Sequence, residues 1–271
     1  MRQWLLSIVL FVSSVATAAP PTYYSFGIVP QLSPSATANL WEPLLTYLSA
    51  ELGVSLRFQT ARDLAEFEKR VSAGDFDFVY LNPFQYTVVQ ATGGYEAFAR
   101  ETGQELRGII IVAKNATMRD LSDLDGRRLA VPSESAFAAA LIPLKVLGQR
   151  QITVQPVVVA SHESVLLSVM RGTQPAGGTI QKMLDRAPPD VRNALRVLWR
   201  SDAYTSHPFA AHTRVSIEFR TRLQQVMLAM SDSAEGRAVL QKINFSGFSA
   251  VAAGDYDAIR RLEIAPQSAP P

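Results

Sequence analysis

Short apolar segments alternate with amphipathic segments along most of the chain. The apolar segment 24–29 ends at Pro30 and is followed by the polar loop 30–39. The next apolar residues recur at helical spacing: Leu40, Trp41, Leu44, Leu45, Leu48 and Leu52. We expect this helix to begin at a capping box formed by Asn39 and Glu42.

The alternation continues with a predicted strand at 54–58, a helix at 64–73 and a buried strand at 76–81. Strands separated by helices indicate a parallel sheet. Ligands of such open sheets bind beyond the carboxyl ends of the strands. The loop 30–39 and the turn 80–83 both lie at that end, so we expect them to border a binding site.

A strand at 107–113 leads to a polar break at 114–117, where we place a crossing into a second lobe. The pattern beyond it predicts a short helix and a strand within 120–132, a helix at 136–147, a strand at 152–159, a helix at 163–171, a turn at Gly177 and Gly178, helices at 181–184 and after Pro189, and a strand at 195–199. Helices at 216–231 and 234–243 are expected to cover the first lobe. Two α/β lobes joined by two crossings would close on a ligand by hinge motion.

The two ends of the chain have their own signatures. We expect a secretory signal peptide at 1–18, with cleavage after Ala18. Its pattern consists of Arg2, the apolar run 4–12 and the small residues 16–18. This predicts export to the periplasm. The proline-rich tail 265–271 is expected to be disordered.

Composition narrows the classes of function. The 271 residues include 26 basic and 24 acidic side chains, so no strong field favours nucleic acid or an anionic membrane. Cysteine is absent and the three histidines are not paired at helical spacing, so we expect no metal and no cofactor. No nucleophile elbow, zinc-protease helix or phosphate loop is found, so an enzyme is not expected.

Several segments, in this order, resemble the phosphonate, phosphite and phosphate binding proteins of ABC transporters: FGIVPQLSP, WEPLLTYLSAELG, GDFDFVYLNPFQY, GIIIVAKN, DLDGRRLAVP, SHESVLLSVMRG, LRVLW and DYDAIRRL. The resemblance implies a two-lobe periplasmic binding protein of type II, each lobe a mostly parallel sheet flanked by helices. We place lobe 1 at 19–114 plus 212–264 and lobe 2 at 115–211.

The resemblance also implies a function. It predicts a monomer that captures a small oxyanion and delivers it to an ABC permease. The alternative is a sensor of the same fold that presents its ligand to a membrane histidine kinase. In both cases the membrane is reached only through the partner.

The resemblance further implies ligand-binding residues. Tyr80 matches an aromatic residue that reaches the oxyanion, with Asn82 beside it in a turn. His162 matches a ligand donor and stands where a strand gives way to a helix start, a position that favours an anion. In the loop 132–140 the hydroxyl-rich run of relatives is mostly replaced by alanine and phenylalanine, which leaves Ser133 and Ser135.

Relatives that bind aminoalkyl phosphonates hold the amine with acidic residues. The matching positions here are Gln181 or Lys182, and His207. Of these, His207 is the first choice and Lys182 the reserve, while His212 is assigned to the return strand. We therefore expect a cleft without carboxylates that takes a compact anion and discriminates against aminophosphonates. Protonation of the histidines is expected to strengthen binding as the pH falls.

Overall fold

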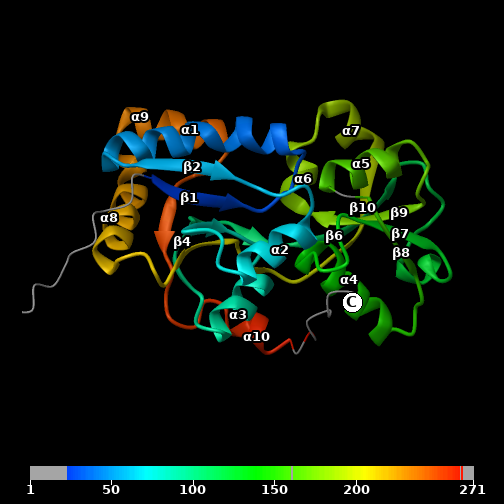
Figure 1. Ribbon diagram of the computed structural model, residues 1–271. Helices are drawn as coiled ribbons and strands as arrows, with labels where there is room; N and C mark the ends of the chain where they lie inside the picture. The colour runs from blue at the N-terminus through cyan, green and yellow to red at the C-terminus, as the bar shows by residue number, and fades with distance from the viewer. Residues whose placement is uncertain (1–22, 160, 263, 265–271) are drawn as a thin grey trace, which may run out of the picture.

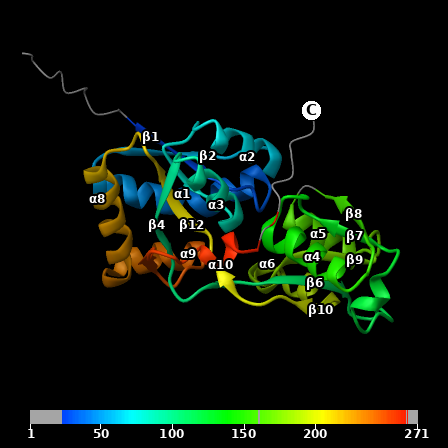
Figure 2. The ribbon, with the colours of Figure 1, turned by 90° about the horizontal axis from the view of Figure 1, so that it is seen from below.

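The computed structural model describes residues 23–159, 161–262 and 264 (Figure 1). The predicted signal peptide and the predicted disordered tail lie outside the described residues. Within them, two mixed sheets stand side by side, each with helices on both faces, as Figures 1 and 2 show from two directions. The predicted two-lobe α/β architecture is confirmed.

The first sheet has the strand order β13-β4-β12-β3-β1-β2. Its strands are β1 (Tyr23–Ile28), β2 (Ser55–Gln59), β3 (Phe78–Tyr80), β4 (Tyr95–Glu101), β12 (Pro208–His212) and β13 (Phe248–Ala250). Helices α1 (Pro34–Leu52) and α9 (Ala234–Ile243) cover one face, and α2 (Leu64–Ser72), α3 (Pro83–Ala91) and α10 (Asp257–Arg260) lie on the other, with α8 (Ile217–Leu228) at the outer end (Figure 1).

The second sheet has the order β10-β6-β9-β7-β8. Its strands are β6 (Gly108–Ala113), β7 (Arg128–Val131), β8 (Gln155–Val158), β9 (Ala176–Ile180) and β10 (Leu195–Arg200). Helices α5 (His162–Met170), α6 (Gln181–Arg186) and α7 (Pro189–Ala194) lie on one side, and a π-helical turn (Phe137–Leu141) that continues into α4 (Ile142–Gln149) lies on the other.

The strand directions agree with mostly parallel lobes. In the first sheet only β12 and β13 run against the other strands, and in the second only β6 does. Between the sheets, β5 (Glu105–Leu106) and β11 (Tyr204–Thr205) pair antiparallel as a two-stranded ribbon. The chain therefore crosses twice, and the two crossing segments are hydrogen-bonded to each other.

The expected positions of the crossings need correction. The strand 108–113 was expected in lobe 1 but lies in the second sheet, and residues 208–211 of β12 were expected in lobe 2 but lie in the first sheet. The reason is that β6 pairs with β9 and β10, whereas β12 inserts between β3 and β4. We propose that the lobes change at 102–107 and at 201–207.

The first long helix begins earlier than predicted. Ser33 caps α1 by accepting a hydrogen bond from the backbone N–H of Ala36 at 3.4 Å, and Pro34 occupies the first turn, where its missing N–H costs nothing. Asn39 and Glu42 lie inside the helix, so the predicted capping box is wrong. The loop beside β1 is correspondingly short.

The predicted turn at Gly177 and Gly178 is also wrong, because both residues lie in the interior of β9. A side-chain Cβ at Gly178 would lie 2.0 Å from the carbonyl oxygen of Ala139, and one at Gly177 would lie 2.5 Å from Val165. These glycines therefore serve close packing rather than a turn. They let the π-helical turn approach one face of the sheet and α5 the other.

Candidate functional site

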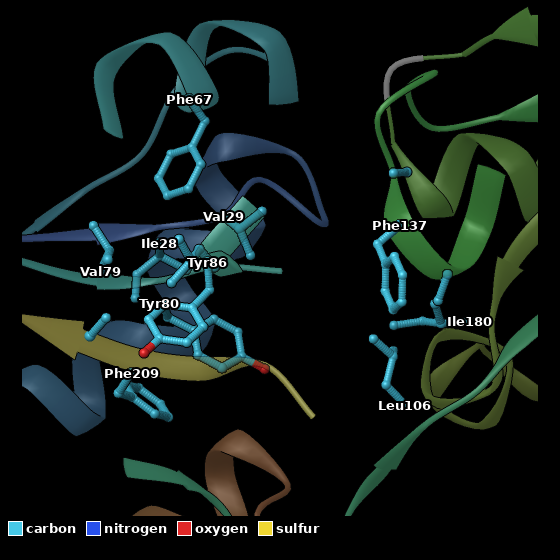
Figure 3. Packing of buried hydrophobic residues seen from close by; sticks show 14 of the residues in the cluster. Ile28, Val29, Phe67, Val79, Tyr80, Tyr86, Leu106, Phe137, Ile180 and Phe209 are labelled. Atoms are coloured by element: carbon cyan, nitrogen blue, oxygen red, sulfur yellow. The ribbon is translucent and has the colours of Figure 1, made fainter. Parts of the chain in front are cut away.

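A small cavity lies between the two lobes, with a volume of about 40 Å³ open to the centres of water-sized molecules. We call it the interlobe cavity. It is lined by Val29, Pro30, Gln31, Leu64, Asn82, Leu106, Pro132, Ala136, Phe137, Ala138, Ala139, His162, Ile180 and His207. Figure 3 shows Phe137 and Ile180 of the second lobe across a gap from Val29 and Tyr80 of the first.

His162 reaches the interlobe cavity from the first turn of α5, where the Ser161 hydroxyl caps the helix. The imidazole is buried, and its Nδ1 lies 2.9 Å from the hydroxyl of the fully buried Thr179. With Nδ1 engaged, Nε2 is the ring atom left for a ligand. Burial lowers the pKa of His162 to about 4, so the ring is neutral at physiological pH.

His207 enters from the other side, just before β12. Its ring stacks on Tyr80 with centroids 5.3 Å apart, and its Nε2 lies 3.0 Å from the side-chain nitrogen of Gln31. Because the amide donates, Nε2 accepts and the ring proton resides on Nδ1. Burial, with smaller effects from the charges of Lys182 and His162, lowers the pKa of His207 to about 3.

These two pKa values overturn one expectation. We predicted histidines that become protonated as the pH falls and thereby strengthen anion binding. In the structure both rings are buried, which penalises the charged form and holds them neutral through the range where histidine ordinarily titrates. Neutral rings can offer hydrogen bonds but no positive charge.

Further donors face the interlobe cavity. The side-chain oxygen of Asn82 caps α3 by accepting from the N–H of Gln85 at 2.8 Å, while its Nδ2 is buried and finds no partner among the described residues. In the π-helical turn the first helical bond is donated by Ala140, to Ala136 at 2.7 Å. The preceding N–H groups at 137–139 have no acceptor within the described part of the chain and remain available to a ligand.

A second cavity of about 30 Å³ adjoins the first and shares Gln31, Leu106, Ile180 and His207 with it. Its wall includes Glu101, at the end of β4, and Lys182, in the first turn of α6, which form an ion pair between the lobes. The prediction of a cleft without carboxylates is therefore wrong. Glu101 is only 3% exposed, and its position follows from the β4 strand, which the sequence pattern did not reveal.

Burial pushes both members of this pair toward their neutral forms. It raises the pKa of Glu101 and lowers the pKa of Lys182 to about 8, while the attraction between the two groups opposes both shifts. At neutral pH we take the pair as ionised, because the Lys182 pKa remains above 7 and the two groups are in direct contact.

Only some of the residues expected to bind ligand line the two cavities. Asn82, His162 and His207 line the interlobe cavity, and Tyr80 lines the second cavity. The hydroxyls of Ser133 and Ser135 lie 3.0 Å from each other, and neither residue lines the two cavities.

The remaining assignments concern α6 and β12. Gln181 donates to Asp185 at 2.7 Å and lines neither cavity, whereas Lys182, the alternative to it, lines the second. His212 ends β12 as expected and packs edge-on against Tyr95.

Three residues near the cavities escaped the sequence analysis. Gln31 follows β1 at the carboxyl edge of the sheet, which was itself the signal that could have identified it. Thr179 orients His162 from the end of β9, and Glu101 ends β4. Neither could be identified without the pairing of strands.

Among the described residues, no group of three or more histidine, cysteine, aspartate or glutamate side chains is placed to hold a metal ion. In the same part of the chain no helix has the length and apolar content needed to span a membrane. The two cavities are lined by hydrogen-bonding groups, and the second is also lined by two ion pairs, Glu101 with Lys182 and Glu105 with Arg107.

Known proteins resemble this chain in sequence and in fold. A family model described as the periplasmic substrate-binding protein of ABC phosphonate transporters matches residues 26–256. The chain is 21% identical over 244 residues to the phosphate-import protein PhnD of Mycolicibacterium smegmatis, covering 78% of this chain and 73% of that protein. It is 22% identical over 256 residues to the phosphonates-binding periplasmic protein of Escherichia coli, covering 89% and 75%.

Among solved structures, PhnD1 from Prochlorococcus marinus in complex with methylphosphonate superposes with a TM-score of 0.81. Sequence identity is 17%, and the match covers 90% of this chain and 97% of that one. At this identity the likeness shows a shared fold.

Proposed function

Because the chain belongs to the family of periplasmic substrate-binding proteins of ABC phosphonate transporters, we propose that it binds a compact phosphorus oxyanion between its lobes. Phosphate, phosphite and methylphosphonate are the ligands we favour. The names of the relatives, one for phosphate import and one solved with methylphosphonate, support this range.

The observation that carries the proposal is a set of hydrogen-bonding groups in the interlobe cavity without partners among the described residues. Asn82 Nδ2 and the N–H groups at 137–139 come from the two lobes and line one small space. His162 Nε2 is a further donor in the tautomer in which Nδ1 accepts from the Thr179 hydroxyl. Burying an anion is costly unless its oxygens are hydrogen-bonded. Donors from both lobes would therefore make ligand binding and lobe closure one event.

The lining of the cavity supports a ligand with a small apolar group on phosphorus. Phe137, Leu106 and Ile180 form an apolar wall on one side. A methyl group would pack against that wall, while the oxygens face the donors.

We further propose that residues 1–18 direct export and that the mature protein delivers its ligand to an ABC permease as a monomer. The family match supports transport over presentation to a histidine kinase.

A thermal-shift screen of the mature protein tests the proposal. Phosphate, phosphite, methylphosphonate and sulfate are added separately at the same pH and ionic strength. A ligand at 100 times its Kd stabilises the protein by about 2.7 kcal/mol, which raises the melting temperature measurably. Titration calorimetry on the best ligand gives its Kd and stoichiometry, and failure of every phosphorus oxyanion to stabilise the protein would refute the proposal.

A further inference from the structure

The ion pair between Glu101 and Lys182 joins the lobes at the wall of the second cavity. Glu101 belongs to the first lobe and Lys182 to the second, 81 residues further along the chain. The Lys182 ammonium also lies over the ring of Phe245, 4.1 Å from its centroid. A carboxylate together with an aromatic face is a favourable environment for an ammonium group.

Lys182 pairs with only one oxygen of the Glu101 carboxylate. One carboxylate oxygen contacts the ammonium, and the other, Oε1, is buried without a partner among the described residues. The hydroxyl of Ser206, 7% exposed and lining the same cavity, is likewise buried without a partner in the described part of the chain. Buried polar atoms without partners indicate that the second cavity can accept a polar guest.

The two cavities are adjacent compartments. Gln31 and His207 lie in the walls of both, so a ligand whose anionic head occupies the interlobe cavity would direct a substituent toward Glu101. In this protein the position beside Glu101 is already occupied by a cation, the Lys182 ammonium. An ammonium on the ligand would find both carboxylates of the second cavity in ion pairs, Glu101 with Lys182 and Glu105 with Arg107. Repulsion by the Lys182 ammonium would outweigh a contact with the remaining Oε1 of Glu101.

We infer that Lys182 is a specificity-determining residue: its ammonium occupies a cation subsite formed by Glu101 and Phe245 and thereby excludes oxyanions that carry an aminoalkyl arm. The inference rests on the proposed oxyanion site. It predicts that removing the lysine side chain exposes a buried carboxylate within reach of the ligand and converts the site to one that prefers a zwitterion.

The test compares three probes by titration calorimetry: methylphosphonate, ethylphosphonate and 2-aminoethylphosphonate. Ethylphosphonate is the uncharged match for the aminoethyl arm. The natural protein is expected to bind ethylphosphonate more tightly than 2-aminoethylphosphonate. In Lys182→Ala, 2-aminoethylphosphonate should gain about tenfold in affinity relative to ethylphosphonate, the scale of one hydrogen bond to a charged group.

Two further variants isolate the cause. Glu101→Gln combined with Lys182→Ala removes the carboxylate and should abolish the gain, whereas Lys242→Ala, an exposed lysine on α9, should leave the natural preference unchanged. Should Lys182→Ala fail to fold by circular dichroism, Lys182→Gln keeps a donor for Glu101 and provides the same comparison.

The outcomes separate this inference from the proposed function. Binding of methylphosphonate by the natural protein, with no relative gain for 2-aminoethylphosphonate in either Lys182 variant, overturns the inference alone. If the natural protein binds no phosphonate but Lys182→Ala binds 2-aminoethylphosphonate, the cation subsite is supported and the proposed function is not. Absence of binding in both proteins overturns both.

Discussion

Replacing Gly178 with alanine would move the backbone donors of the proposed oxyanion site without replacing a polar side chain. The new Cβ would lie 2.0 Å from the carbonyl oxygen of Ala139, whereas ordinary contact begins at 3.4 Å. The oxygen belongs to backbone rather than to a flexible side chain, so the π-helical turn must move away from β9. The N–H groups at 137–139 would move with it.

Two effects of different size are expected. Overpacking of this kind costs about 1–3 kcal/mol of stability. Each lost hydrogen bond to an anion costs about 1.5–3 kcal/mol, so loss of one or two donors weakens binding by roughly 100-fold. The effect on affinity should therefore exceed what the loss of stability alone would produce in a folded protein at 25 °C.

Chemical denaturation and titration calorimetry with the best oxyanion measure the two effects. Gly148→Ala is the matched control, because that glycine lies in α4 with nothing within 4 Å of its Cβ position, and alanine there should stabilise the helix by about 0.5–1 kcal/mol. Natural affinity in a folded Gly178→Ala protein would show that the donors at 137–139 do not hold the ligand.

Three further outcomes are expected. His162→Ala should weaken oxyanion binding by about 1.5–3 kcal/mol with an unchanged circular dichroism spectrum; calorimetry showing an unchanged Kd would make His162 structural. The pKa of His162 is about 4 when folded and near 6.5 when unfolded, so its contribution to stability is complete above pH 6.5 and is lost as the pH falls toward 4. Denaturation at pH 7 and pH 5 should therefore show a loss about 2 kcal/mol larger in the natural protein than in His162→Gln; Glu68, whose pKa burial raises to about 7, acts in the opposite direction but equally in both proteins. Intact mass of the exported protein should correspond to a chain beginning at Ala19, and a retained leader would contradict the predicted cleavage.

Local features of the fold were predictable from the sequence. Apolar periodicity identified β1, α2 and β3 within a residue or two, because each element buries a face whose spacing is visible in its own residues. The start of α5 at His162 was also predictable from local residues, because Ser161 is a strong capping residue placed directly before an apolar run.

Features that depend on contacts between distant segments were not predictable. A pair of glycines such as Gly177 and Gly178 is compatible in sequence with a turn and with a tightly packed strand. Only the approach of Ala139 and Val165 distinguishes the two cases. The pairing of Glu101 with Lys182 joins two lobes, so no local pattern contains it. The neutrality of His162 and His207 likewise follows from burial, which their neighbours in sequence do not reveal.

The position of β12 in the first sheet has a consequence for the order of folding. This strand separates β3 from β4, yet it is synthesised only after the whole second sheet. The second lobe is continuous in sequence and can condense early, while the first must keep two strand edges unpaired until residues 208–212 arrive. Unpaired edges are prone to intermolecular association. We therefore expect chains that end before β12 to aggregate rather than to form a folded first lobe. In the full chain, we expect pairing of β12 with β3 and β4 to limit the rate of folding.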